Sequence, residues 1–139
     1  KRFIFKYLPE STESGIIQRS VARKMVKGTI EDWHPFRTYI DSGADLSLFR
    51  RNDADLLGLN LTQGEYHPIM GRWQNLHPAY IHTLKMKIGD IELNVKAAFA
   101  DSDEVPRLLG RTDIFPHFKL TFNEQKLEIT FQTQEKQNK

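Results

Sequence analysis

Asp41-Ser42-Gly43-Ala44 is the stretch of the sequence whose residue types could do chemistry. A strand-like run, residues 36–40, leads directly into it, and the apolar residues Leu46, Leu48 and Phe49 follow. A carboxylate at the end of a core strand costs free energy unless it is paired or hydrogen-bonded. Asp41 therefore either has a functional role or belongs to a strand-end Asx turn, in which Asp41 or Ser42 bonds nearby backbone amides. The local pattern does not separate the two.

The composition of the 139 residues predicts one soluble globular domain, with 39% hydrophobic and 27% charged residues. There is no apolar run of about 20 residues and no signal-peptide pattern, so we expect a cytoplasmic protein without a membrane partner. The net charge is only +2 and the charges are interleaved, which argues against nucleic-acid binding. The basic residues Arg23, Lys24 and Lys27 fit the solvated face of a strand.

Cofactor and metal chemistry find no support in the sequence. The absence of cysteine excludes disulfides, thiol catalysis and cysteine-ligated zinc. The five histidines show no metal-ligand spacing, and no phosphate-binding or dinucleotide-binding motif is present. We therefore expect neither a metal nor a cofactor.

Hydrophobic alternation predicts an all-β fold with one or two short helices, arranged as a closed, mostly antiparallel barrel. Expected strands cover residues 16–26, 36–40, 46–49, 59–66, 79–88, 91–99, 105–109, 118–122 and 127–131. Expected helices cover residues 54–57, capped by Asn52 or Asp53 and ended by Gly58, and 112–115, capped by Thr112. Residues 1–14 are predicted to be an arm or tail, residues 15–132 the domain, and residues 133–139 a polar tail.

A second motif, Leu108-Leu109-Gly110-Arg111, follows far downstream of Asp41. A strand into Asp-Ser-Gly-Ala, a hairpin with a glycine near its tip, and then this motif before a short helix resemble the retropepsin-like aspartic proteases. These are single-domain relatives of the retroviral proteases. The resemblance covers residues 16–131 and implies an acid-protease-like barrel and aspartic endopeptidase activity.

In this family two carboxylates share one proton around a single water, one as base and the other as acid. The resemblance makes Asp41 the catalytic aspartate. The chain holds one such motif, because Gly89-Asp90 and Thr112-Asp113 lack the following glycine. The resemblance therefore implies a homodimer in which Asp41 and its symmetry mate form the dyad, acting on a peptide or protein substrate. Residues 1–14 and the 118–131 hairpin are candidates for the dimer interface.

Other residues take roles from the same resemblance. Ser42 would bond the opposite loop, Gly43 would allow the two loops to approach closely, and Ala44 completes the loop. Asp45 would bind substrate backbone and pair with Arg111, although a plain structural ion pair explains these two residues equally well. Residues 108–110, including Leu109 and Gly110, would pack under the loop as support.

Ile69, Met70 and Gly71 match the flap, a hairpin that closes over bound peptide in the family. Relatives often carry a glycine-rich tip, whereas this chain has Met70-Gly71-Arg72-Trp73-Gln74-Asn75. Trp73 could wall a specificity pocket or pack on its own hairpin.

Two other functions remain open at this point. The same barrel could be a catalytically weak or inactive peptide-binding or dimerisation module. It could also be the regulatory domain of a larger chain that processes itself, since the sequence opens at Lys1 rather than at a methionine.

Overall fold

The computed structural model describes residues 1–71 and 75–134. Its longest feature is the central hairpin, formed by β10 (Ala79–Ile88) and β11 (Ile91–Ala100). The two strands pair antiparallel along their whole length, with Ala79 opposite Ala100 and Ile88 opposite Ile91. Gly89 closes the turn with a positive φ of 59°, a conformation that favours glycine. The predicted hairpin is confirmed.

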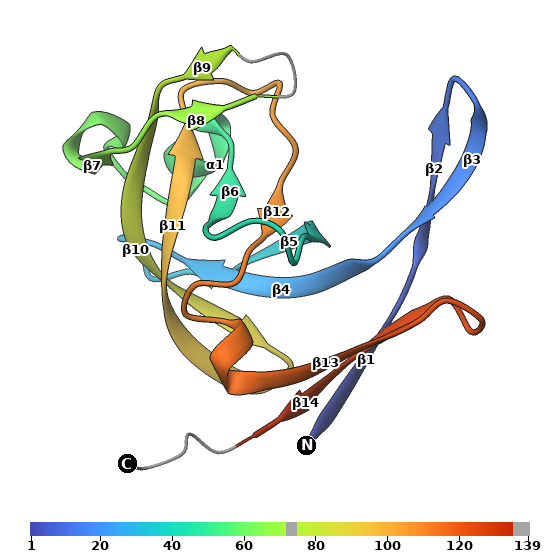
Figure 1. Cartoon of the computed structure of the whole chain (residues 1–139). Helices are drawn as coiled ribbons and strands as arrows, with labels where there is room; N and C mark the ends of the chain where they lie inside the picture. The colour runs from blue at the N-terminus through green and yellow to red at the C-terminus, as the bar shows by residue number, and fades with distance from the viewer. Residues whose placement is uncertain (72–74, 135–139) are drawn as a thin grey trace.

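Six strands close into a barrel in the order β11-β6-β12-β5-β4-β10, and β10 returns to β11 (Figure 1). The β11–β6 and β12–β5 contacts are parallel and the other four are antiparallel. The predicted closed, mostly antiparallel barrel is therefore confirmed. The four strands not yet bounded are β4 (Val21–Lys27), β5 (His34–Ile40), β6 (Ser47–Phe49) and β12 (Leu108–Leu109).

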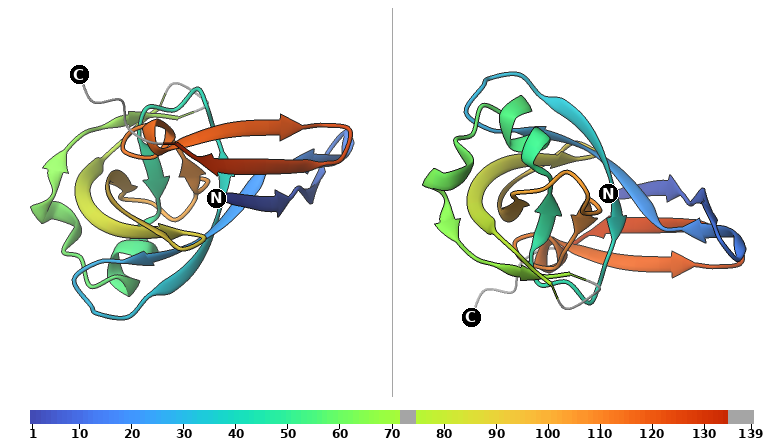
Figure 2. Two further views of the ribbon diagram at one scale, coloured as in Figure 1. Left: turned by 90° about the horizontal axis from the view of Figure 1, so that it is seen from below. Right: turned by 90° about the horizontal axis from the view of Figure 1, so that it is seen from above.

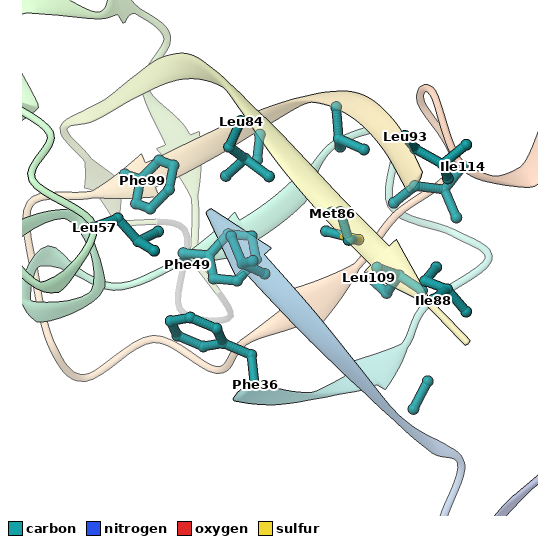
Figure 3. Packing of buried hydrophobic residues seen from close by; sticks show 14 of the residues in the cluster. Phe36, Phe49, Leu57, Leu84, Met86, Ile88, Leu93, Phe99, Leu109 and Ile114 are labelled. Carbon is teal, nitrogen blue, oxygen red and sulfur yellow. The ribbon is translucent and has the colours of Figure 1, made fainter. Parts of the chain in front are cut away.

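Three aromatic rings from different strands meet inside the barrel (Figure 3). Phe49 stacks on Phe99 with ring centroids 5.2 Å apart, and its other side meets the Phe36 ring edge-on at 5.4 Å. Large buried aromatic side chains contribute much of the hydrophobic free energy of a small core. This cluster joins β5, β6 and β11, and so holds the strand that leads into Asp41.

The helix α1 (Arg51–Leu56) begins three residues before the predicted start, and its N-cap is Arg50 rather than Asn52 or Asp53. The loop after β11 explains the shift. The Ser102 carbonyl accepts the Arg51 N–H, and the Asp103 carboxylate accepts the Asn52 N–H. These partners satisfy backbone donors that a helix start leaves free.

Two short 3-10 helices complete the described helical structure. η2 (Phe115–His117) begins at the last residue of the expected 112–115 helix, and residues 112–114 form a turn instead. η1 (Leu61–Gln63) occupies the middle of the expected 59–66 strand, of which only β7 (Glu65–Tyr66) is extended. The strand prediction was wrong there because the His82 ring bonds the Leu61 carbonyl at 2.9 Å and holds the turn against β10. No helix within residues 1–71 and 75–134 is long and apolar enough to cross a membrane.

A three-stranded sheet lies at one end of the barrel, in the order β1-β14-β13. It consists of β1 (Arg2–Lys6), β13 (Phe118–Asn123) and β14 (Glu128–Thr133), so the predicted C-terminal hairpin is confirmed. The Phe131 ring contacts Phe5 and Phe118 edge-on, at 5.5 and 5.4 Å between centroids. Residues 2–6 are thus tied to the end of their own chain.

The expected 16–26 strand is two strands, which separate at Ser20. β2 (Leu8–Thr12) and β3 (Gly15–Arg19) form a separate hairpin, here called the N-terminal arm. The predicted domain start at residue 15 falls at the first residue of β3, inside this hairpin. Figures 1 and 2 show the arm standing away from the barrel, on the side to which β13 and β14 also extend. The Ser20 carbonyl accepts the Ile40 N–H of β5 at 3.0 Å, so the β4–β5 pairing begins at Ser20 and the residues before it belong to the arm.

A small hairpin lies at the other end of the barrel from the three-stranded sheet (Figure 1). It pairs β8 (Ile69–Met70) with β9 (Leu76–His77). Arg72, Trp73 and Gln74 of the expected tip lie outside the described residues, as does most of the predicted C-terminal tail.

Lys24 differs most from its predicted environment. Arg23 is exposed, but the Lys24 side chain is only 2% exposed and its ammonium nitrogen bonds the Thr38 hydroxyl. On β4 the residues 22, 24 and 26 point into the barrel, so strand alternation buries the lysine despite its charge. Burial lowers the pKa of Lys24 well below its ordinary value.

Candidate active site

Asp41 lies directly after β5, on a loop that returns to the barrel at β6. Its backbone N–H donates to the Leu109 carbonyl at 3.0 Å, which continues the β5–β12 pairing. The carboxylate oxygen Oδ1 accepts the Gly43 N–H at 2.9 Å, and the Asp41 carbonyl accepts the Ala44 N–H at 3.2 Å. The Asx turn is therefore present. It orients the half-buried carboxylate but leaves Oδ2 without a hydrogen-bond partner among the described residues.

Gly43 lies tightly against this carboxylate. A Cβ at position 43 would lie 3.3 Å from Asp41 Oδ1. Ser42 and Gly43 are both exposed, at the outermost point of the loop. Their backbone is thus accessible to another molecule.

The segment after β12 fixes the rest of the loop. The Arg111 N–H donates to the Ala44 carbonyl at 3.0 Å, and the Thr112 N–H donates to the Asp45 carbonyl at 2.8 Å. The Gly110 N–H donates to the buried Ser47 hydroxyl at 3.0 Å. Residues 109–112 therefore underlie the loop. Each of their hydrogen bonds to it involves a backbone atom of at least one partner.

Gly110 has no room for a side chain. A Cβ there would lie 2.5 Å from the backbone carbonyl of Leu46. The glycine of the second motif is therefore required by packing against the loop of the first motif. The structure brings Leu109, Gly110 and Arg111 to the Asp41 loop, which sequence separation alone did not establish.

Asp45 and Arg111 are neighbours without forming the expected ion pair in the described part of the chain. Both residues are exposed, and the contact between the two segments runs through the backbone. The Asp45 carboxylate and the Arg111 guanidinium are thus available to other partners.

Ile69, Met70 and Gly71 belong to the β8–β9 hairpin. The Gly71 N–H donates to the Asn75 carbonyl at 2.8 Å, and Met70 is 62% exposed. Within residues 1–71 and 75–134, no hydrogen bond or ion pair joins these three residues to the Asp41 loop. The single chain therefore leaves the hairpin and the carboxylate as separate features.

Comparison with known families decides the classification. The family model described as Aspartyl protease matches residues 26–112, a span that includes both motifs. The chain belongs to the aspartyl protease family.

Solved structures show the same fold for this aspartyl protease. A retropepsin-like aspartic protease from Rickettsia conorii has 22% identity and a TM-score of 0.62, over 94% of this chain and 90% of that one. The EIAV protease, solved in complex with the inhibitor HBY-793, has 19% identity and a TM-score of 0.51, over 67% of this chain and 82% of that one. A comparison with curated proteins gives no match.

Sequence reasoning missed a polar cluster that joins α1 to the segment before β12. Asp53 of α1 is 2% exposed and accepts a two-pronged bond from Arg107, with both N–O distances 2.9 Å. It also accepts the Arg50 backbone N–H at 2.9 Å. Hydrogen bonding to Asp53 raises the pKa of the Arg107 guanidinium. An acid in the first helical turn is visible in the sequence, but its partner is 54 residues away.

Proposed function

We propose that this protein is an aspartic endopeptidase whose dyad forms from Asp41 of two identical chains. One observation carries the proposal. The Asp41 carboxylate is held by the Gly43 N–H on one oxygen, has the other oxygen free in the described structure, and lies on a loop fixed by residues 109–112. Family membership supports the reading of this carboxylate as catalytic.

The chemistry requires a second carboxylate. One ionised carboxylate takes a proton from water, and the water oxygen attacks the scissile carbonyl carbon. The other carboxyl, still protonated, donates to the carbonyl oxygen and stabilises the tetrahedral intermediate. Proton transfer to the amide nitrogen then lets the C–N bond break. Two carboxyl groups so near each other cannot both ionise, so a symmetric pair supplies one base and one acid.

A homodimer supplies that pair with the least additional structure. The exposed Ser42 and Gly43 would meet their mates across a two-fold axis, with the Ser42 hydroxyl bonding the backbone of the opposite loop. No bond within the described chain occupies that hydroxyl.

The N-terminal arm and the three-stranded sheet are the interface segments that we propose. They extend to the same side of the barrel (Figure 2), and both carry exposed apolar residues, such as Ile16 at 71% and Ile4 at 57%. An isolated two-stranded hairpin is marginal in water, and an unpaired sheet edge attracts another strand. A second copy would cover both.

The substrate would be an extended peptide lying between the dyad and the β8–β9 hairpin as flap. Ile69, Met70 and Gly71 would cover it, and Asp45 would bind its backbone. The exposure of Met70 in the single chain leaves apolar surface for such a contact.

Replacement of the carboxylate tests the catalytic assignment. Asp41→Asn should abolish cleavage of an unfolded protein mixture between acid and neutral pH, and a statine-type inhibitor should block the parent protein. Asp55→Asn, which removes an exposed carboxylate on α1, is the matched control and should keep full activity. Undiminished cleavage by Asp41→Asn would overturn the proposal. A parent protein that binds peptides but cuts none would favour the binding-module alternative.

Mixing tests the shared dyad. When equal amounts of parent chain and Asp41→Asn are unfolded and refolded together, about a quarter of the original activity per total chain should remain, because only parent–parent dimers carry two carboxylates. About half would mean that each chain acts alone. Sedimentation should find a dimer at the assay concentration, and an active monomer would contradict the dyad.

A further inference from the structure

Two neighbouring hollows lie on the outer face of β5, the strand that leads into Asp41. Phe36 and Thr38 point into the barrel, so Arg37 and Tyr39 point outward. One hollow of about 250 Å³ lies between β5 and the N-terminal arm, and a second of about 620 Å³ lies beside α1. Arg37 and Arg107 line both hollows, with Arg50 in the first and Arg23 in the second. We call these four residues and the space between them the arginine groove.

The acids at the groove are already engaged. Asp53 accepts the fork from Arg107 and the Arg50 N–H. Glu10 bonds Arg19 at 2.8 Å, and it lies close enough to Tyr39 that burial and this carboxylate together raise the pKa of the tyrosine hydroxyl. Arg50 uses its Nε on the Val105 carbonyl at 2.6 Å. Arg107 and Arg50 are thus partly engaged as well, so Arg23 and Arg37 are the two arginines of the groove without a partner among the described residues, and no carboxylate that lines the groove is free.

Arg23 and Arg37 are directly opposite each other in the antiparallel β4–β5 pair. Like charges in this position destabilise a sheet, because the two Cβ atoms lie only about 5 Å apart. Neither guanidinium has a hydrogen-bond or ion-pair partner within residues 1–71 and 75–134. Folding therefore gives no reason for this pair, whereas an anionic ligand between the two forks would.

The position of the groove indicates the ligand. Arg37 precedes Asp41 by four residues on one strand, a distance of about 13 Å. An extended peptide needs about four residues to span the same distance. The apolar Leu8 and Pro9 of the arm also line the first hollow. They suit the apolar part of a peptide whose acidic side chain lies at the arginines.

We propose that the arginine groove binds an Asp or Glu side chain of the polypeptide substrate, about four residues from the scissile bond. The proposal rests on the proposed endopeptidase function for its distance from the cut, but binding itself does not depend on cleavage.

Binding is therefore tested in the 139-residue chain carrying Asp41→Asn, which leaves the probe intact. The probes are a fluorescently labelled octapeptide with two glutamates and its counterpart with two glutamines, compared by anisotropy. The Glu peptide should bind about tenfold more tightly, and Arg37→Glu should remove that preference. Lys96→Glu, an equal charge change on the exposed face of β11, should retain it. Equal binding of the two peptides, or an unchanged preference in Arg37→Glu, would overturn the proposal.

Three further measurements complete the test. Arg37→Glu places opposite charges across β4–β5, so it should fold and melt no lower than the parent, which excludes unfolding as the cause of lost binding. If inorganic phosphate or a single-stranded oligonucleotide displaces the Glu peptide at a tenfold lower concentration than free Glu peptide does, the groove recognises phosphate and the proposal is wrong. In a cleavage-site profile, the parent protein should enrich Asp and Glu about four residues from the cut, and Arg37→Glu should not. A protein that shows the Glu preference but cuts nothing would disprove the function and keep the groove.

Discussion

β3 and β4 follow one another in the chain, yet the burial of their side chains differs completely. On β4 alternate side chains are buried in the barrel, whereas all five residues of β3 are exposed. Only Ser20, bonded to Ile40, separates them. The barrel buries the apolar side chains of its strands in its own core, while the N-terminal arm carries apolar side chains that its own chain does not cover. This difference suits the dimer proposed above, in which the barrel keeps its own core and a second copy covers the arm.

The barrel should be most sensitive at Phe49, which is fully buried between Phe36 and Phe99. Phe49→Ala should lower the free energy of unfolding by about 3–5 kcal/mol, because it removes apolar contacts and leaves a cavity. Urea denaturation followed by tryptophan fluorescence measures the loss. A change below about 1 kcal/mol would mean that the three rings do not form a single core.

The contact between the barrel and the Asp41 loop is tested at Gly110. Gly110→Ala should cost about 1–3 kcal/mol, because the added Cβ meets the Leu46 backbone at 2.5 Å. Cleavage should fall further than stability, since the displaced segment holds Ala44 and Asp45. Unfolding and peptide cleavage measured on the same preparation separate the two effects. A variant with normal activity would show that residues 109–112 do not position the loop.

Lys24→Met should stabilise the barrel at neutral pH by on the order of 1 kcal/mol, because a buried amine is replaced by an apolar side chain of similar length. Burial lowers the pKa of Lys24 in the folded state, so the unfolded chain binds the extra proton between that lowered pKa and about 10.4. The contribution of Lys24 to the free energy of unfolding of the parent protein therefore rises with pH across that window. The advantage of Lys24→Met should shrink from pH 7 to pH 10. Lys96→Met, at an exposed position, should show no such trend.

The smallest effect on unfolding is expected in the N-terminal arm. Ile16→Ser should change the unfolding free energy of the monomer by less than about 0.5 kcal/mol, because the side chain is 71% exposed. It should nevertheless weaken the proposed dimer, and sedimentation at several protein concentrations measures this. A dimer of unchanged affinity would remove Ile16 from the interface.

Local patterns were sufficient for much of the fold. The 79–88 and 91–99 alternation around Gly89 predicted the central hairpin, and the Asp-Ser-Gly and Leu-Gly-Arg motifs indicated the family that the comparison then showed. Patterns of this kind succeed because a strand and its turn are specified by residues next to one another.

Long-range packing decided the rest. Loop 101–103 moved the start of α1, and His82 turned residues 61–63 into a 3-10 helix instead of a strand. The position of Lys24 inside the barrel also went against its residue type.

Asp41 shows the division most clearly. Its residue type and its neighbours in the sequence determined a carboxylate on a strand-end turn. Only the tertiary structure placed Gly110 and Arg111 beneath that turn and paired Arg23 with Arg37 four residues behind it. Such contacts join segments that are far apart in the chain. They depend on strand order and register, and no local pattern encodes these.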